Sequence, residues 1–281
     1  MQARGGNDKN QYALGGSYFK NEGAIVNTYF KRYNFNVNLQ NKLTDKLKIK
    51  TVLFPSYSVK EGPISGGEFS QSKLGVVIRA FTRRTDRGIG IQEDDEDPEV
   101  GLWVDPVTEA RRSANLSNTF GFNGNTNISY DFAKGLTGSI RIGARITDGK
   151  TKSYYTKDFG RGFLTNGIGT RFHYQSIRWN IQNRLDYRTA FGNKKKNRLN
   201  FMGVYEQTYS SRESEYLRVS DFPIETLGFN ALQNGLLPDI PITSTEENAL
   251  ISYLGRVNYG FDNRYNSVSY THLTLPTKRI V

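Results

Sequence analysis

The stretch FGFNGNTNISYDF, at residues 120–132, alternates strictly between two kinds of side chain. The intervening residues, Gly121, Asn123, Asn125, Asn127, Ser129 and Asp131, are polar or glycine. Every second residue is instead aromatic, aliphatic or small: Phe120, Phe122, Gly124, Thr126, Ile128, Tyr130 and Phe132. Alternation with a period of two over this length predicts a long β-strand with one apolar face and one wet face.

The same pattern recurs along the chain. Clear alternation covers residues 33–39, 136–146, 177–191, 199–209 and 249–261, and weaker strands fit at 10–20 and 47–58. Together with 120–132 these segments make about eight strands. Most of them reach the roughly 9–11 residues that a tilted membrane-spanning strand needs.

The connections between these segments alternate in length. Short turns are expected at 41–46, 133–135, 192–197 and 261–265, and long connections at 59–117, 148–172 and 211–247. Aromatic residues also gather at both ends of 120–132. Tight turns at one end, long loops at the other and two aromatic girdles are typical of an antiparallel, up-and-down transmembrane β-barrel.

Composition favours the same class. Only 36% of the 281 residues are hydrophobic, whereas Gly (28), Tyr (17) and Phe (17) are plentiful. A soluble domain of this length normally has a more apolar composition, and the aromatic content argues against disorder. A β-sandwich or adhesin with one buried face also alternates and stays as the alternative fold. No run of about 18 apolar residues predicts a membrane helix, and the first thirty residues lack a signal-peptide layout.

Several motifs resemble one family, the SusC/RagA-type TonB-dependent transporters. The motifs are ARGGNDKNQYALGGSYFKNEGAIVNTYFKRYNFNVNLQNKLTDKLKI near the start, FAKGLTGSIRIG at 132–143, DFPIETLGFNALQNG at 221–235 and ISYLGRVNYGFDNRY at 251–265. The resemblance implies part of a 22-stranded outer-membrane barrel from a Gram-negative, Bacteroidetes-like cell. It also implies a TonB complex, a SusD-like surface lipoprotein as partner, and import of oligosaccharides or peptides.

The resemblance divides the chain into two parts. Residues 1–265 are expected to be a partial barrel, and the plug, the TonB box and a signal peptide are not found in them. Residues 266–281, NSVSYTHLTLPTKRIV, do not resemble the family and are interpreted as a tail that is foreign to it. We therefore expect a transporter fragment, with a non-transporting surface binding or adhesin-like protein as the alternative.

The net charge of +11 comes from basic residues scattered over strands, turns and loops, which does not suggest nucleic-acid binding. On the wet faces of the strands, six arginines are expected to face the barrel lumen: Arg141, Arg145, Arg178, Arg184, Arg188 and Arg256. Two interpretations stay open for them. They pair with carboxylates of a plug, or they line the path of an anionic or hydroxyl-rich solute.

A second candidate site lies in the connection 211–247. Tyr216, Phe222, Phe229 and Asn230 are expected to contact the ligand or the lipoprotein lid from an extracellular loop. Aromatic faces stack on sugar rings or peptide side chains. These residues could instead serve only to pack the loop.

Enzymatic chemistry finds little support. The chain has no cysteine and two histidines, and no catalytic or metal-binding spacing appears, so neither a cofactor nor a metal is expected. The acidic run EDDED at 93–97 lacks the spacing of a calcium loop and is expected to be solvated. The segment QSKLGVVIRAFTRR at 71–84 predicts a short helix over the barrel mouth.

Overall fold

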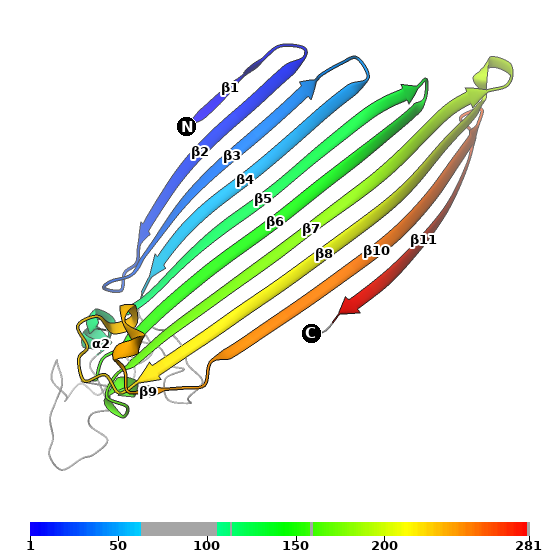
Figure 1. The fold of residues 1–281 in the computed structure, drawn as a ribbon. Helices are drawn as coiled ribbons and strands as arrows, with labels where there is room; N and C mark the ends of the chain where they lie inside the picture. The colour runs from blue at the N-terminus through cyan, green and yellow to red at the C-terminus, as the bar shows by residue number, and fades with distance from the viewer. Residues whose placement is uncertain (63–105, 113, 158–159, 280–281) are drawn as a thin grey trace.

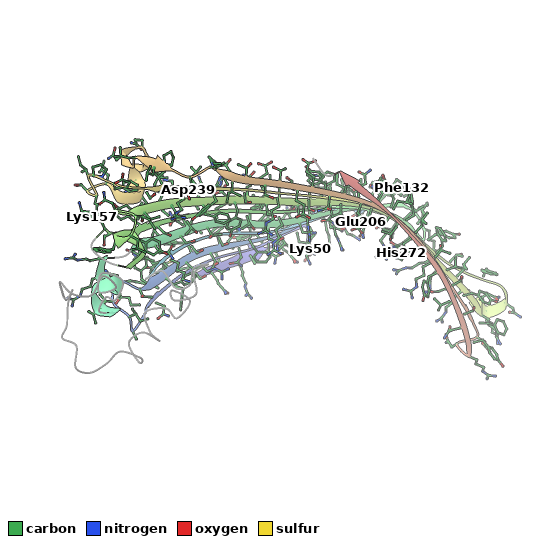
Figure 2. All side chains as sticks on the ribbon, turned by 90° about the horizontal axis from the view of Figure 1, so that it is seen from below. Lys50, Phe132, Lys157, Glu206, Asp239 and His272 are labelled. Carbon is green, nitrogen blue, oxygen red and sulfur yellow. The ribbon has the colours of Figure 1, made fainter. Side chains whose placement is uncertain are left out.

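A computed structural model describes residues 1–62, 106–112, 114–157 and 160–279, and these form one curved antiparallel sheet (Figures 1 and 2). The sheet has eleven strands in the spatial order β1-β2-β3-β4-β5-β6-β7-β8-β10-β11, with β9 paired to β8 outside this path. Neighbours in sequence are therefore neighbours in space, as the up-and-down topology predicted.

The strands lengthen toward the middle of the chain. Their bounds are β1 Gln2–Gly6, β2 Asn10–Glu22, β3 Tyr29–Lys42, β4 Leu47–Glu61, β5 Ala114–Ala133, β6 Leu136–Tyr155, β7 Ile168–Phe191, β8 Asn197–Ser220, β9 Leu237–Pro238, β10 Ile242–Phe261 and β11 Tyr265–Arg279. The short helical pieces are α2 Pro106–Arg112, α3 Gly160–Phe163, η3 Asn193–Lys195, η4 Gly228–Asn230 and η5 Leu232–Asn234. The segments 71–84 and 93–97 lie outside the described residues. None of the described helices is long and apolar enough to cross a membrane.

Strand register gathers the alternating residues onto one continuous face. Ile128 of β5 lies opposite Ile49 of β4 and Ile140 of β6, and Ile142 lies opposite Ile181 of β7. Directly opposed residues of antiparallel strands share a face, so the apolar side chains of every strand point the same way. We call this surface the apolar face and its opposite the polar face.

Aromatic side chains border the apolar face in register. Tyr18, Tyr33, Tyr57 and Phe120 stand opposite one another across β2 to β5, and each is 41–56% exposed. Near the other end of the strands, exposed aromatic side chains recur at Tyr130, Phe132, Tyr187, Phe191, Phe201, Tyr259 and Phe261. Two aromatic borders around an aliphatic band are typical of a barrel wall that faces lipid. A sandwich would need a second sheet on this face, and the described residues form a single sheet.

The connections follow the predicted short and long rhythm. The tight turns lie at 7–9, 43–46, 134–135, 192–196 and 262–264, all at one end of the sheet (Figure 1). Gly135 adopts φ +82°, and a Cβ there would lie 2.1 Å from the carbonyl oxygen of Arg188. Asp262 and Asn263 reach positive φ as the short polar residues that best tolerate it.

The long connections are shorter than predicted because the strands extend further. The expected loop at 148–172 is reduced to 156–167, and the expected loop at 211–247 is reduced to 221–241. In the added segments polar and aromatic side chains occur on both faces, so the regular hydrophobic alternation stops although backbone pairing continues, as between His173 and Glu215. The sequence pattern marks only the part of each strand that faces an apolar medium.

Three strands add to the eight that were predicted. β1 pairs with β2, and β11 pairs with β10 over the whole of 265–279, which includes most of the segment interpreted as a tail. The outermost of the eight strands expected from the sequence, at 10–20 and 249–261, are therefore not the edges of the sheet. In the part of the chain that the structure describes, β1 and β11 are the outer strands of the sheet.

A charge placed on each face tests this assignment. Ile142→Arg should destabilise the membrane-inserted barrel by about 2–4 kcal/mol, because residue 142 lies within the aliphatic band. Asn125→Arg is the control, since Asn125 lies on the polar face opposite Val52 and Gly143. Denaturant titration of the full-length barrel that contains this segment, folded into vesicles, gives the change in the free energy of unfolding for both substitutions. Equal damage from the two substitutions would contradict the assignment.

The outer strands make a second prediction. β1 and β11 each leave one row of backbone N–H and C=O groups without a strand partner in the described sheet, and such edges template aggregation. We expect the 281-residue chain, produced alone, to form inclusion bodies and to give no heat-modifiable monomer in detergent. A soluble monomer with cooperative unfolding would rule out the barrel assignment.

Candidate functional site

All six predicted arginines lie on the polar face of the sheet. Arg141 lies opposite Asn127 and Gln182, and Arg145 lies opposite Asn123 and Arg178. This register also fixes the facing of Arg178. The remaining three arginines lie on the same face because each stands opposite a polar-face residue: Arg184 opposite Ser139, Arg188 opposite Asn200 and Arg256 opposite Met202. The facing predicted from the alternation is thus the facing in the structure, whereas the role of these side chains stays a prediction.

The six differ in how they are paired. Arg184 donates two hydrogen bonds to the carboxylate of Asp186, at 2.6 and 2.7 Å, and Arg256 donates one to Asn258 at 3.0 Å. For the remaining four, the described residues supply no carboxylate within 4.0 Å: Arg141, Arg145, Arg178 and Arg188. The polar face therefore holds several guanidinium groups without a counter-charge from the described chain.

A hollow of about 580 Å³ lies on the polar face over β3 to β6, and we call it the arginine hollow. Its lining includes Arg32, Asn34, Asn36, Asn123 and Arg145. Arg32 donates from Nε to Asn34 Oδ1 at 2.7 Å, and Asn34 donates in turn to Ser17 Oγ at 3.1 Å. The hollow thus combines positive charge with amide groups that can donate or accept.

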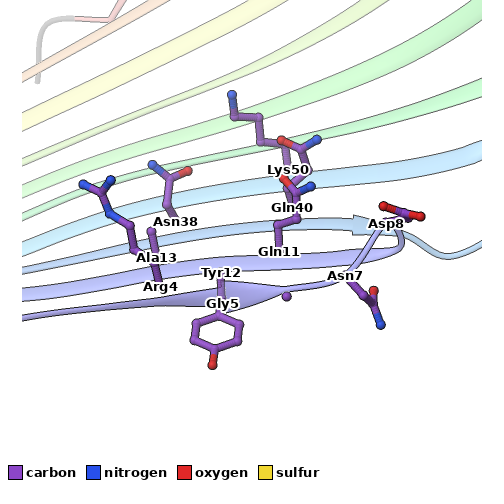
Figure 3. A pocket seen from close by; sticks show the side chains of 11 residues that line it. Arg4, Gly5, Asn7, Asp8, Gln11, Tyr12, Ala13, Asn38, Gln40 and Lys50 are labelled. Atoms are coloured by element: carbon purple, nitrogen blue, oxygen red, sulfur yellow. The ribbon is translucent and has the colours of Figure 1, made fainter.

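A second hollow, of about 610 Å³, lies near the tight turn between β1 and β2. Figure 3 shows Arg4, Asn38, Gln40 and Lys50 on one side of the sheet there, while Tyr12 points to the other side. The division follows the alternation of each strand. The polar face is therefore rich in amides and cations close to the tight turns as well.

The four residues predicted in an extracellular loop take different places. Tyr216 lies within β8, opposite Phe172 of β7, so its assignment to a loop is wrong. Phe222 has no exposed surface, and its ring meets Tyr154 edge-on with centroids 5.3 Å apart. It packs the loop and presents no face to a ligand in this structure.

Phe229 and Asn230 are held against the opposite side of the sheet from the arginines. Arg171 donates to the carbonyl oxygens of Phe229 and Asn230 at 3.0 and 3.2 Å, and Lys152 lies 5.8 Å from the centre of the Phe229 ring. Register places Lys152 and Arg171 opposite each other on the continuation of the apolar face. The loop 221–241 therefore folds onto the side of the sheet that continues the apolar face beyond the aliphatic band. We call this side the outer wall.

Polar contacts fix this loop in place. Asp221 accepts a hydrogen bond from the side chain of Asn166 at 2.7 Å, and its own N–H donates to Thr165. Glu225 accepts from the hydroxyl of Tyr154 at 3.1 Å and from the backbone N–H of Lys157 at 2.7 Å. The connections 156–167 and 221–241 are thereby joined, although they are far apart in sequence.

Two aromatic residues on the polar face were missed from the sequence. Phe172 and Tyr174 stack in β7 with centroids 5.8 Å apart, and Phe172 lies opposite Tyr216. They share the facing of Arg178 and Arg184, because all four have even numbers in β7. Continuing the strand from 177 down to Ile168 would therefore have placed both rings on the polar face. We call Phe172, Tyr174 and Tyr216 the inner aromatic cluster.

An exposed apolar surface lies on the same long-loop end. It comprises Ile224, Leu227, Leu236, Leu237 and Ile240, which are 55–89% exposed. All five residues belong to the connection 221–241, and Leu237 lies in the two-residue strand β9, which pairs with β8. We call this surface the apolar tip, and exposed apolar patches of this kind mark interaction sites.

The described residues contain no group of three or more side chains suited to hold a metal ion. His173 bonds Asp148 at 3.0 Å, but register places both on the outer wall, away from the arginine hollow. Recognition through aromatic, amide and guanidinium groups is what the arrangement offers chemically.

The anchor of the loop can be tested by truncating its buried ring. Phe222→Ala should free 221–241 from the wall, since removing a buried phenylalanine ring costs about 3–5 kcal/mol locally. Faster hydrogen exchange and protease cleavage within 221–241 would report the release, with β7 and β8 still protected. Ile240→Ala, at an 89% exposed position, is the control. Unchanged exchange in Phe222→Ala would contradict the anchoring role.

Comparison with known proteins gives a consistent picture. No family model matches the sequence. The chain is 23% identical over 93% of its length to TonB-dependent receptor P3 of Formosa agariphila, and 22% identical over 93% of its length to TonB-dependent receptor P26 of the same species. It spans about a quarter of those relatives, 26% of each.

The fold is also found in a solved structure. The RagAB peptide transporter matches 98% of this chain, with a TM-score of 0.76 and 18% identity, and the chain covers 31% of that protein chain. The aligned part corresponds to a stretch of barrel wall. These similarities confirm the resemblance that the motifs predicted.

Proposed function

We propose that this chain, a barrel segment of the SusC/RagA type of TonB-dependent transporter, is part of an active importer in the outer membrane of a Gram-negative bacterium. The observation that carries the proposal is the division of one sheet into two media. An aliphatic band with aromatic borders covers one face, and amides and arginines cover the other. The first suits lipid, and the second suits a water-filled lumen or a plug domain.

The imported solute is proposed to be an oligosaccharide or a peptide. The inner aromatic cluster supports this, because its rings lie on the polar face near the long-loop end, where a solute arrives. Arg212 shares this face opposite Ser176 and adds a hydrogen-bond donor. Aromatic faces beside charged donors suit both sugar rings and peptide side chains.

The partner is proposed to be a SusD-like surface lipoprotein, with energy supplied through TonB. The apolar tip supports the first contact, because it is exposed, lies at the long-loop end and is held on a loop fixed by Phe222 and Glu225. A preformed surface of this kind loses little conformational entropy on binding. The TonB contact would involve other parts of the transporter.

Import is tested in cells that produce the full-length transporter containing this segment. Uptake of a labelled peptide or oligosaccharide library should need TonB and should fall when Phe172 and Tyr216 are both changed to Ala. Losing two stacking faces should weaken binding by about tenfold or more. Phe229→Ala, on the outer wall, is the matched control. Uptake that persists without TonB would refute the proposal.

The lid contact is tested separately. Changing Leu227, Leu236 and Ile240 to Ser should reduce co-purification of the lipoprotein, while solute binding to the isolated transporter stays unchanged. Full co-purification would remove the apolar tip from the interface.

A further inference from the structure

The polar face holds two guanidinium groups that register brings together and that have no counter-charge among the described residues. Arg145 of β6 and Arg178 of β7 lie directly opposite each other. Directly opposed residues of antiparallel strands have Cβ atoms about 4.5–5.5 Å apart, and like charges in such pairs are unfavourable. An anion bound between the two guanidinium groups would attract both of them and offset their mutual repulsion.

The carboxylates of the polar face are already engaged elsewhere. Asp186 accepts both bonds of Arg184, at 2.6 and 2.7 Å, and Glu206 accepts from Gln182 at 2.8 Å. Glu246 accepts from Asn248 at 3.1 Å, and Asp131 accepts from Thr137 at 2.7 Å. Within the described residues no carboxylate reaches Arg145 or Arg178, so a charge partner has to come from another molecule or from another part of the transporter.

The space beside this pair is open because the neighbouring row of side chains is small. Ser17, Asn34, Ser56, Gly121, Thr147 and Ser176 lie opposite one another across β2 to β7. Gly121 adds no side chain to this row and lets Ser56 Oγ lie close to its backbone, 2.8 Å from where a Cβ would stand. The middle of the row, from Asn34 to Thr147, forms the floor of the arginine hollow, whose 580 Å³ falls within the range of about 300–1,000 Å³ that ligand pockets occupy.

The hollow presents arginine side chains at its two ends and amide side chains between them. Arg145 lines one side of it, with Arg178 as its neighbour on the next strand, and Arg32 stands across the floor, oriented by its bond to Asn34. Three strand spacings, about 14 Å, separate β3 from β6. Asn34, Asn36 and Asn123 lie between the arginines and can donate to or accept from hydroxyl groups.

We propose that Arg145 and Arg178 form an oxyanion site for a sulfate or carboxylate group on an imported solute, with Arg32 and the asparagines contacting its hydroxyl-bearing part. The planar guanidinium fork fits both oxyanions through paired N–H donors. This inference rests on the proposed import function and narrows the solute to an anionic one.

The experiment uses the full-length transporter purified in detergent, with three matched sugars as probes: glucose 6-sulfate, glucuronate and glucose. Binding is measured by calorimetry for the wild type, for the double variant R145Q/R178Q and for R188Q. Arg188 is the matched control, because it lies on the polar face outside the hollow and, like the pair, has no carboxylate partner in the described part of the chain.

We expect the double variant to bind one or both of the charged sugars about tenfold more weakly or worse, as loss of charge-assisted hydrogen bonds implies. Glucose binding should not change, and R188Q should behave as the wild type. The two charged probes then distinguish sulfate from carboxylate recognition.

Three results would overturn the inference. Equal weakening in R188Q would mean diffuse charge attraction only, and unchanged binding in the double variant would mean that the pair meets no solute. Loss of heat-modifiable barrel in the double variant would mean that the arginines pair with carboxylates of the transporter itself. In each case TonB-dependent uptake of neutral solutes would show whether the import function still stands.

Discussion

The lateral hydrogen bonding between antiparallel strands is the constraint on which the rest of the structure depends. It fixes each residue opposite one partner on either side, as Ile140 is fixed between Ile128 and Asn183. A slip by one residue would exchange the two faces of a strand. The apolar band, the aromatic borders and the row of small residues under the arginine hollow are all consequences of this single register, accumulated over neighbouring strands.

This constraint explains how much could be predicted from the sequence. The alternation in segments such as 120–132 and 177–191 predicted the strands and the facing of all six arginines. Lipid on one side of a strand and water on the other produce a period of two in side-chain hydrophobicity. The outer parts of β6, β7 and β8 lie beyond the aliphatic band, and the loop 221–241 covers part of one side, so their residues show no such period and were assigned to loops. Their pairing is visible only when the neighbouring strand is known.

The loop residues were less predictable for a different reason. The burial of Phe222 depends on Tyr154, which lies in another hairpin, and the attachment of Phe229 and Asn230 depends on Arg171. No local pattern encodes contacts over such sequence distances. Phe172 and Tyr174, by contrast, follow from the alternation once β7 is given its full length, and missing them was a consequence of ending that strand too early.

The length of β7 and β8 also determines how far the barrel wall extends beyond the membrane. A strand of 24 residues is about 80 Å long, and at a tilt of about 40° it rises roughly 60 Å, whereas the apolar band needs about 25 Å. The wall therefore stands well clear of the headgroup layer as a collar. Any molecule that binds the outer end of the wall would do so above the membrane surface, away from the lipid headgroups.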